Sequence, residues 1–173
     1  LEEKWIFKSY SNKRQETSFL ENAKKMTDVY LKWRKTNKNT FVASEKHLEF
    51  AYGGITLNGK IDWIEQDANG EYEIVDFKTG AKISQNKADE DWQIHIYAKL
   101  IEKEYGKLPT KATLYFLAED VKRTVIIDKK KAQDILDKEL KPLIDEILKG
   151  NFTAKPGAPC YRCDYKEICS FKV

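Results

Sequence analysis

The sequence predicts an α/β or α+β fold, with a central mixed sheet of about five strands flanked by helices. Three observations predict it. Apolar side chains recur every three to four residues in three segments, which is typical of amphipathic helices. Five other segments are short and rich in β-branched and aromatic residues, as strands are. Turn-forming residues separate these segments along the chain.

The first helix is expected at residues 15–35, where Phe19, Ala23, Met26, Tyr30 and Trp33 follow the helical spacing. A strand is expected next, at 41–50. Its alternation puts Glu45 and His47 on one face and Leu48 and Phe50 on the other. The pair of glycines at 53 and 54 ends this strand.

Two more strands are expected at 55–66 and 71–78, joined by the loop Ala68-Asn69-Gly70. A three-residue loop with glycine in the third position favours a type I turn followed by a left-handed residue. Counting back from that loop pairs Asp67 with Glu71 and places Asp62 opposite Asp76. A loop of two or four residues would put the two aspartates on opposite faces of the hairpin.

The second half of the chain predicts a helix at 91–105, strands at 111–118 and 121–128, and a long helix at 129–149. Ile94, Ala98 and Ile101 form the apolar face of the first of these helices. Pro142 predicts a kink in the last one. The apolar positions of the last helix are Ile135, Leu136, Leu140, Leu143, Ile144, Ile147 and Leu148. Residues 150–173 are expected to be a loop with one helical turn.

Composition limits the possible classes of protein. The 173 residues are enough for one domain, with 41% hydrophobic and 34% charged residues. The 31 basic and 28 acidic residues nearly cancel, which excludes the strong field of a histone-like protein. No apolar run reaches about 18 residues, so no membrane span is expected. The chain begins without methionine, and we expect residues 1–173 to be a C-terminal piece of a longer protein.

All three cysteines lie in the tail at 150–173. Cys160, Cys163 and Cys169 fall within ten residues, and the rest of the chain has none. A tight, odd-numbered set indicates a metal or cluster site better than a disulfide framework. Reducing conditions and a cytoplasmic location follow as expectations. Three thiolates alone cannot fill a [4Fe–4S] cluster, and a zinc site would need a fourth ligand.

Asp76 and Lys78 lie two residues apart on a strand and therefore project from the same face. A bare D-x-K pattern is more often an exposed ion pair. Here the apolar flanks Ile74, Val75 and Phe77 indicate an interior strand, with Asp62 on its neighbour. Two carboxylates beside a lysine suit Mg²⁺ or Mn²⁺ and phosphodiester hydrolysis.

For other polar side chains, the sequence signal for a role in such a site is weaker. Glu45 could supply a third acid, and His47 on the same strand face is less favoured as a ligand. His95 is interpreted as structural or exposed. The basic clusters at 32–35 and 129–131 are interpreted as solvated helix surface.

The motifs "GKIDWI", "EIVDFKTG" and "QIHIYA" resemble, in order, those of the RecB-like branch of the PD-(D/E)XK nucleases. The resemblance implies a restriction-endonuclease-like fold, with Asp62 and Asp76 as metal ligands and Lys78 as the catalytic lysine. It also implies that Gln93 and Tyr97 line the site from a helix. A spacing of four residues puts these two on one helical face. Glu45 matches the upstream acid of the family less specifically.

The two ends of the chain show further resemblance. "CYRCDYKEIC" resembles the C-x-x-C-x₅-C end of family members that hold a [4Fe–4S] cluster, and the opening sixteen residues resemble the run-up to nuclease domains behind UvrD-type superfamily 1 helicases. The fourth cysteine and an upstream histidine of the family have no counterpart here. We therefore expect the cluster to be absent or incomplete in this chain.

The resulting expectation is a metal-dependent DNA nuclease, acting as an exonuclease on single-stranded ends in repair or recombination. Its partners would be DNA and helicase domains upstream in the parent chain. A stand-alone CRISPR-associated or phage-type RecB-like exonuclease is the nearest competing hypothesis. Two different classes of protein also fit parts of the sequence: a catalytically silent module that binds DNA or protein, and a structural iron–sulfur protein.

Overall fold

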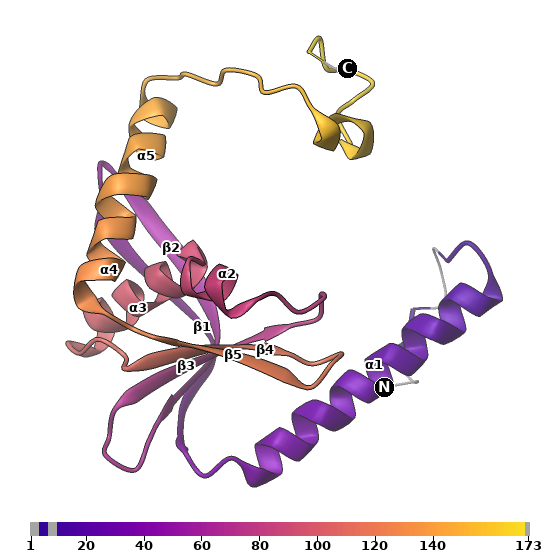
Figure 1. Ribbon diagram of the computed structural model, residues 1–173, viewed down its shortest axis with the longest axis vertical. Helices are drawn as coiled ribbons and strands as arrows, with labels where there is room; N and C mark the ends of the chain where they lie inside the picture. The colour runs from indigo at the N-terminus through magenta and orange to yellow at the C-terminus, as the bar shows by residue number, and fades with distance from the viewer. Residues whose placement is uncertain (1–3, 7–9, 172–173) are drawn as a thin grey trace.

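A five-stranded sheet in the order β1-β2-β3-β4-β5 forms the centre of the structure (Figure 1). This computed structural model describes residues 4–6 and 10–171. The strands are β1 (Thr40–Tyr52), β2 (Ile55–Gln66), β3 (Tyr72–Lys78), β4 (Lys111–Phe116) and β5 (Val121–Ile126). The helices are α1 (Lys13–Thr36), α2 (Gln85–Asp89), α3 (Trp92–Tyr105), α4 (Lys129–Asp134) and α5 (Lys141–Leu148). The predicted order of elements is confirmed, and α2 is an addition to it.

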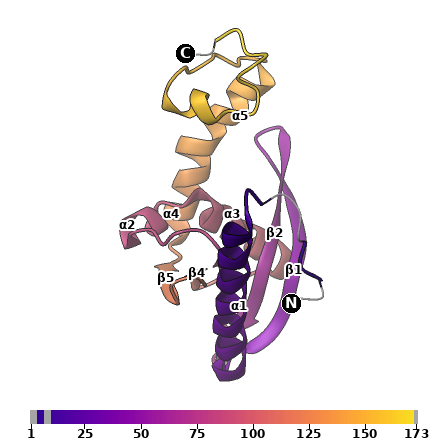
Figure 2. The same cartoon turned by 90° about the vertical axis from the view of Figure 1, so that its right-hand side faces the viewer.

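The sheet is mixed, as expected. β3 and β4 run parallel, whereas the other neighbouring strands run antiparallel. Parallel neighbours need a crossover connection, and α2 and α3 provide it. The fold is restriction-endonuclease-like, with helices on both faces of the sheet (Figure 2).

The register of the β2–β3 hairpin matches the prediction. The backbone pairs run from Gln66 opposite Tyr72 to Trp63 opposite Val75. The loop closes through Asp67, whose N–H donates to Glu71 O at 3.0 Å and whose O accepts from Gly70 N at 3.0 Å. Gly70 has φ +75°, the left-handed conformation that favours glycine. Continued by one residue, this register places Asp62 opposite Asp76.

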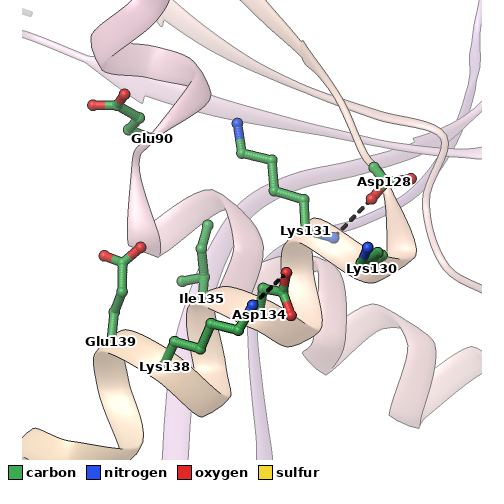
Figure 3. Close-up of a pocket in the computed structure, with 8 residues that line it drawn as sticks. All are labelled: Glu90, Asp128, Lys130, Lys131, Asp134, Ile135, Lys138 and Glu139. Atoms are coloured by element: carbon green, nitrogen blue, oxygen red, sulfur yellow. Dashed lines mark hydrogen bonds and ion pairs between the residues drawn. The ribbon is translucent and has the colours of Figure 1, made fainter.

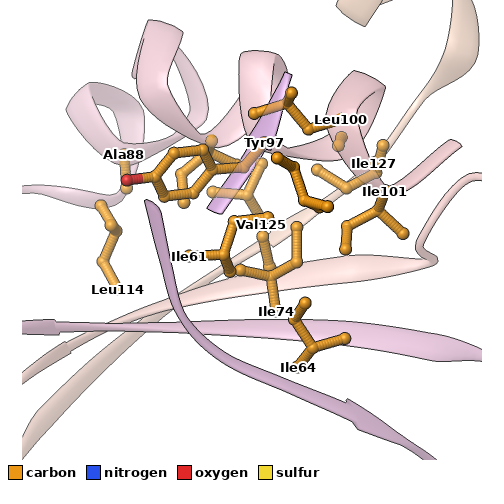
Figure 4. Packing of buried hydrophobic residues seen from close by; sticks show 14 of the residues in the cluster. Ile61, Ile64, Ile74, Ala88, Tyr97, Leu100, Ile101, Leu114, Val125 and Ile127 are labelled. Atoms are coloured by element: carbon orange, nitrogen blue, oxygen red, sulfur yellow. The ribbon is translucent and has the colours of Figure 1, made fainter. Parts of the chain in front are cut away.

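Strand alternation separates two apolar clusters on the two faces of the sheet. Ile64 and Ile74 face α3 and lie in the larger cluster (Figure 4). Trp63 and Val75 face the other way, onto Trp33 of α1. The edge-on contact between the Trp33 and Trp63 rings, with centroids 5.4 Å apart, fixes α1 against the sheet.

The alternation of side chains along β2 is interrupted near Ile61, where β2 pairs with β1 beyond the last β2–β3 backbone pair. Ile61 and Ile64 both lie in the α3-side cluster, although strict alternation would put them on opposite faces. Opposite this point, Glu45 is left out of the β1–β2 backbone pairing and has φ +52°, an unusual value for a residue with a side chain. The β1–β2 register is the same on both sides of Glu45, and the shift in this ladder lies between Phe41 and Ala43.

The long C-terminal helix is divided into three segments and does not simply kink at Pro142. Pro142 has no N–H and its ring would clash with the carbonyl of Lys138 in a regular helix. The chain adopts a π-helical segment, Ile135–Leu140, between α4 and α5. A π-helical segment widens the helix, and it is a known response to a steric clash or a missing hydrogen bond such as the one that Pro142 causes.

The expected apolar face of this helix is only partly buried. Ile135, Leu136 and Ile144 are buried against the domain. Leu143, Ile147 and Leu148 are 45–56% exposed, so these apolar positions of α5 are not covered by the rest of the described chain. The hairpin tip at Gly53-Gly54 lies against this helix, where a Cβ on Gly53 would approach Lys141 to 2.9 Å.

The cysteine tail leaves α5 and runs beyond the sheet (Figures 1 and 2). Its one helical turn is the 3₁₀ segment Ala158–Arg162. Residues 1–3 and 7–9 of the opening that resembles a helicase-linked segment, and 172–173 of the tail, lie outside the described residues. In the part of the chain that the structure describes, no helix is long and apolar enough to cross a membrane.

Gly59 of β2 should be intolerant of a side chain. A Cβ there would lie 2.8 Å from Tyr97 Cε1 and 2.9 Å from Leu100 Cδ1, both from α3. We predict that Gly59→Ala lowers the free energy of unfolding in urea by about 1–3 kcal/mol, as overpacking does. Gly80→Ala is the control, because no atom lies within 4 Å of a Cβ at that position. Equal effects of the two substitutions would contradict close packing of β2 on α3.

Candidate active site

Asp76 and Lys78 lie at the carboxyl end of β3, on the face covered by α3. Asp76 is the more buried, with its side chain 4% exposed, and Lys78 is 30% exposed. Lys78 Nζ lies 2.7 Å from Asp76 Oδ2. This approach is an ion pair without hydrogen-bond geometry, and no other described donor reaches Asp76 Oδ2. The structure therefore holds a buried carboxylate oxygen beside a partly accessible ammonium group.

A chain of hydrogen bonds holds Lys78 against α3. Its Nζ donates to Gln93 Oε1 at 2.6 Å, and Gln93 Nε2 donates to Tyr97 OH at 2.9 Å. Tyr97 OH in turn donates to the carbonyl of Lys60 on β2 at 2.8 Å. Gln93 and Tyr97 are therefore on one helical face, as predicted, and they connect β3 to β2 through α3. Gly59, next to Lys60, leaves room for the Tyr97 ring.

The first turn of α3 is fixed by Asp91. This residue is the N-cap, and its Oδ1 accepts from Gln93 N at 2.8 Å. An N-cap aspartate satisfies one of the orphan N–H groups that begin every helix. The cap places Gln93 over the end of β3. Sequence analysis missed this role, although an aspartate immediately before an apolar helical segment is the standard signal for it.

Asp62 approaches from the neighbouring strand. Its Oδ2 accepts from Phe77 N at 2.8 Å, so the carboxylate replaces a backbone partner at the end of the β2–β3 ladder. This bond orients Asp62 toward the residue between Asp76 and Lys78. An ionised carboxylate has about four acceptor sites, so one donated N–H leaves capacity for a cation.

Burial shapes the electrostatics of the site. Loss of solvent raises the pKa of Asp76, and the nearby charges of Asp62 and Asp91 act in the same direction. Lys78 opposes the rise by its charge and proximity. Burial also raises the pKa of Tyr97, followed by the charge of Asp76, so Tyr97 stays a neutral phenol. The site thus has an excess of negative charge that a single lysine does not remove.

Comparison with known proteins assigns the family. A family model described as the PD-(D/E)XK nuclease superfamily matches residues 1–170. The chain belongs to the PD-(D/E)XK nuclease superfamily. Members of this superfamily are typically metal-dependent nucleases and generally use Mg²⁺ or Mn²⁺.

Solved structures support the same fold. The crystal structure of SSO0001 matches with a TM-score of 0.51 at 15% identity, covering 92% of this chain and 80% of that one. Similarity at this identity shows a shared fold alone. A search of curated proteins finds no significant match.

The donors present in this PD-(D/E)XK domain fit a hard divalent cation. Asp76 Oδ2 is buried, and the one described group that compensates its charge is the Lys78 ammonium at 2.7 Å, which leaves the second carboxylate at the site without such a partner. Asp62 supplies the second carboxylate. Oxygen donors from one or two carboxylates, completed by water and substrate phosphate, are the usual protein contribution to Mg²⁺.

Glu45 is not brought into this group. Its side chain is 59% exposed and its carboxylate forms an ion pair with Lys60. Among the described residues, no three His, Cys, Asp or Glu side chains converge as a metal site. The third-acid role for Glu45 therefore stays a prediction. The Lys60 side chain, which pairs with it at the rim of the site, was not singled out from the sequence.

The two histidines lie outside the site. His47 is exposed on β1, where it lines a hollow with Glu49 and Asn58, and it belongs to no converging set of three metal ligands among the described residues. His95 is fully buried, and its Nε2 lies 3.0 Å from the Asp89 carbonyl. The structural interpretation of His95 is confirmed by this contact.

The basic clusters are largely solvated, as expected, but Trp33 of the first is a core residue. The second cluster borders a separate hollow of about 390 Å³ between the α2–α3 junction and α4 (Figure 3). Charges of both signs line it and pair with each other, as Lys138 does with Asp134 at 3.1 Å. It contains none of the predicted site residues, and its mixed charges favour no anionic substrate.

The cysteine tail forms no assembled site in this structure. Cys160, Cys163 and Cys169 are free thiols, and Cys163 is exposed. They are not among any converging set of metal ligands in the described ranges. Apolar side chains around them are 61–83% exposed, namely Tyr161, Tyr165, Ile168 and Phe171. The three thiols as placed do not fit a [4Fe–4S] cluster.

The raised pKa of Asp76 predicts a pH-dependent stability. Without metal, the native state binds this proton more tightly than the unfolded chain does. The free energy of unfolding therefore falls as pH rises from about 4, the usual aspartate pKa, through the raised pKa of Asp76. Asp76→Asn removes this titration, so its stability relative to the wild type should increase as pH rises, measured by urea unfolding.

Asp67→Asn provides a control of opposite sign. The N–H of Glu71 donates to Asp67 Oδ1 at 3.0 Å and lowers the pKa of Asp67. This variant should lose stability relative to the wild type as pH rises from the lowered pKa of Asp67 to about 4, and the difference should stay constant above that pH, where Asp76 titrates. Parallel pH profiles for wild type and Asp76→Asn would contradict the electrostatics of the site.

Proposed function

We propose that this chain is a metal-dependent deoxyribonuclease that hydrolyses phosphodiester bonds in DNA. The observation that supports it is the meeting of Asp62 and Asp76 across β2 and β3, with Lys78 held beside them. Membership of the PD-(D/E)XK nuclease superfamily makes nucleic acid the substrate class. A surface ion pair would need none of the burial and hydrogen bonding found around Asp76.

Each residue has a distinct role in this proposal. Asp62 and Asp76 hold the Mg²⁺ or Mn²⁺ ion, which when bound polarises a phosphoryl oxygen and lowers the pKa of its water. Lys78, as an ammonium group, donates from Nζ to the phosphate or orients the attacking water. Gln93 positions Lys78 through its amide oxygen. Tyr97 holds the Gln93 amide in that orientation and ties it to β2.

The finer assignment follows the order of the motifs. We infer a RecB-like nuclease that acts as an exonuclease on single-stranded ends, in repair or recombination, within a helicase-nuclease. Residues 1–173 would form its nuclease domain, with the cysteine tail at 150–173. In a full-length protein with a fourth ligand, the three tail cysteines would join a [4Fe–4S] cluster. A cytoplasmic location belongs to the same proposal.

A second candidate is a catalytically silent module that binds DNA. The observation that favours it is the position of Glu45, whose carboxylate pairs with Lys60 and leaves two acids at the site. The nuclease and the silent module share the fold and Lys78. Only the nuclease would hydrolyse DNA, so an activity assay distinguishes them.

The proposed nuclease is tested by release of labelled nucleotides from single-stranded DNA in Mn²⁺. Asp76→Ala and Lys78→Ala should each lower the rate at least about a hundredfold, because each removes a group that stabilises transition-state charge. Lys87→Ala is the matched control, since Lys87 is an exposed lysine of α2. Chelation of the metal should abolish release in the wild type. Metal-independent release, or release unchanged in both variants, would disprove the assignment.

A further inference from the structure

A further acid lies at the start of α3, the helix that covers the candidate active site. Asp91 is the N-cap of α3, and its Oδ1 accepts from Gln93 N at 2.8 Å. Its backbone is fixed as well, because Asp91 N donates to the carbonyl of the fully buried Ala88 at 3.1 Å. The residue is half-buried. A well-anchored carboxylate therefore lies two residues from Gln93, whose side chain binds Lys78.

The second carboxylate oxygen of Asp91 has no partner in the part of the chain that the structure describes. The bond from Gln93 N is the one hydrogen bond that the carboxylate accepts there, and no described cation forms an ion pair with it. An ionised carboxylate has about four acceptor sites, so most of its capacity is unused. The capping bond therefore leaves the negative charge of Asp91 without a compensating cation.

The charge of Asp91 acts on groups inside the site. Burial is the main cause of the raised pKa of Asp76 and of Tyr97, and the charge of Asp91 acts on both in the same direction. These two groups belong to different elements, β3 and α3. The only ammonium group among the described contacts of Asp76 is Lys78. Asp62 and Asp91 are thus left as two uncompensated carboxylates, a charge that one divalent cation would offset.

Capping alone does not require an aspartate at this position. Asn, Ser and Asp are about equally good N-caps, since each offers an oxygen to a free N–H in the first turn of the helix. An aspartate adds a charge, which the positive end of the helix dipole tolerates well. Asp128 is a matched case elsewhere in the chain. It caps α4 by the same kind of bond, from Lys131 N at 2.7 Å, and lines the separate hollow beside α4.

We propose that Asp91 is the third acid of the candidate active site and that it has two roles there. By capping α3, Asp91 positions Gln93 and, through it, Lys78. By its charge, it strengthens binding of the divalent cation that Asp62 and Asp76 hold. The proposal rests on the nuclease function proposed above and adds a positioning residue to it. Because no three acidic side chains converge as metal ligands among the described residues, Asp91 acts from outside the set of direct ligands.

The charge is tested by Mn²⁺ binding, followed by electron paramagnetic resonance, and by unfolding in urea, so that neither measurement requires turnover. Asp91→Asn and Asp91→Ser keep a capping oxygen and remove the charge. Both should unfold at nearly the urea concentration of the wild type. Both should bind Mn²⁺ about three- to tenfold more weakly, as expected for loss of one charge near a divalent cation in a solvated site. Raising KCl from about 0.02 M to about 0.5 M should shrink this difference, because salt screens charges.

The capping role is tested by Asp91→Ala, which removes the oxygen as well as the charge. At saturating Mn²⁺ this variant should release labelled nucleotides about tenfold more slowly than Asp91→Asn, because Gln93 and Lys78 are held less precisely. Asp128→Asn and Asp128→Ala are the matched controls. They make the same changes at the start of α4 and should leave Mn²⁺ binding unchanged.

The outcomes separate this inference from the proposed function. Metal-dependent cleavage by the wild type, with folded Asp91→Asn and Asp91→Ser proteins that bind Mn²⁺ equally well, would leave the nuclease and overturn the role of the charge. Weaker Mn²⁺ binding by both variants, without cleavage by the wild type, would support the third acid and favour the silent module. Equal cleavage rates for Asp91→Ala and Asp91→Asn would overturn the positioning role. Equal losses of Mn²⁺ binding in the Asp128 variants would overturn the proposal, as would absence of Mn²⁺ binding by the wild type.

Discussion

The register of the β2–β3 hairpin is the constraint on which the site depends. Asp62 and Asp76 are fourteen positions apart in sequence and meet only because three loop residues separate the strands. Gly70, with φ +75°, makes that loop possible, and hydrogen bonds between Asp67, Gly70 and Glu71 close it. A slip of one residue would turn Asp62 toward Trp33 and α1. The two carboxylates would then lie on opposite faces of the sheet.

Helix α3 completes the site that this register begins. The crossover from β3 to β4 returns α3 over the end of β3, and its N-cap Asp91 sets the position of Gln93. The hydrogen bonds through Gln93 and Tyr97 then hold Lys78 beside Asp76. Because Tyr97 also binds the Lys60 carbonyl, the position of the lysine depends on the packing of β2, β3 and α3 together.

Much of this arrangement could be predicted from local sequence signals. The strand alternation around Asp76, the loop at Gly70 and the spacing of Gln93 and Tyr97 all depend on near neighbours, and the structure confirms them. Glu45 could not be placed in the same way. Its backbone is left-handed, with φ +52°, a conformation that strand alternation does not predict for a residue with a side chain. The exposed face of α5 also escaped prediction, because periodicity shows that a helix is amphipathic and not whether a partner covers it.

The central claim is that Asp62 and Asp76 together bind a divalent cation. Binding of Mn²⁺ to the chain, followed by electron paramagnetic resonance, tests it without any requirement for turnover. The account predicts that Asp62→Asn and Asp76→Asn each weaken Mn²⁺ binding by about tenfold or more, whereas Lys78→Ala retains it, because the ammonium group competes with the cation for Asp76. Mn²⁺ binding that survives both aspartate substitutions unchanged would contradict the account.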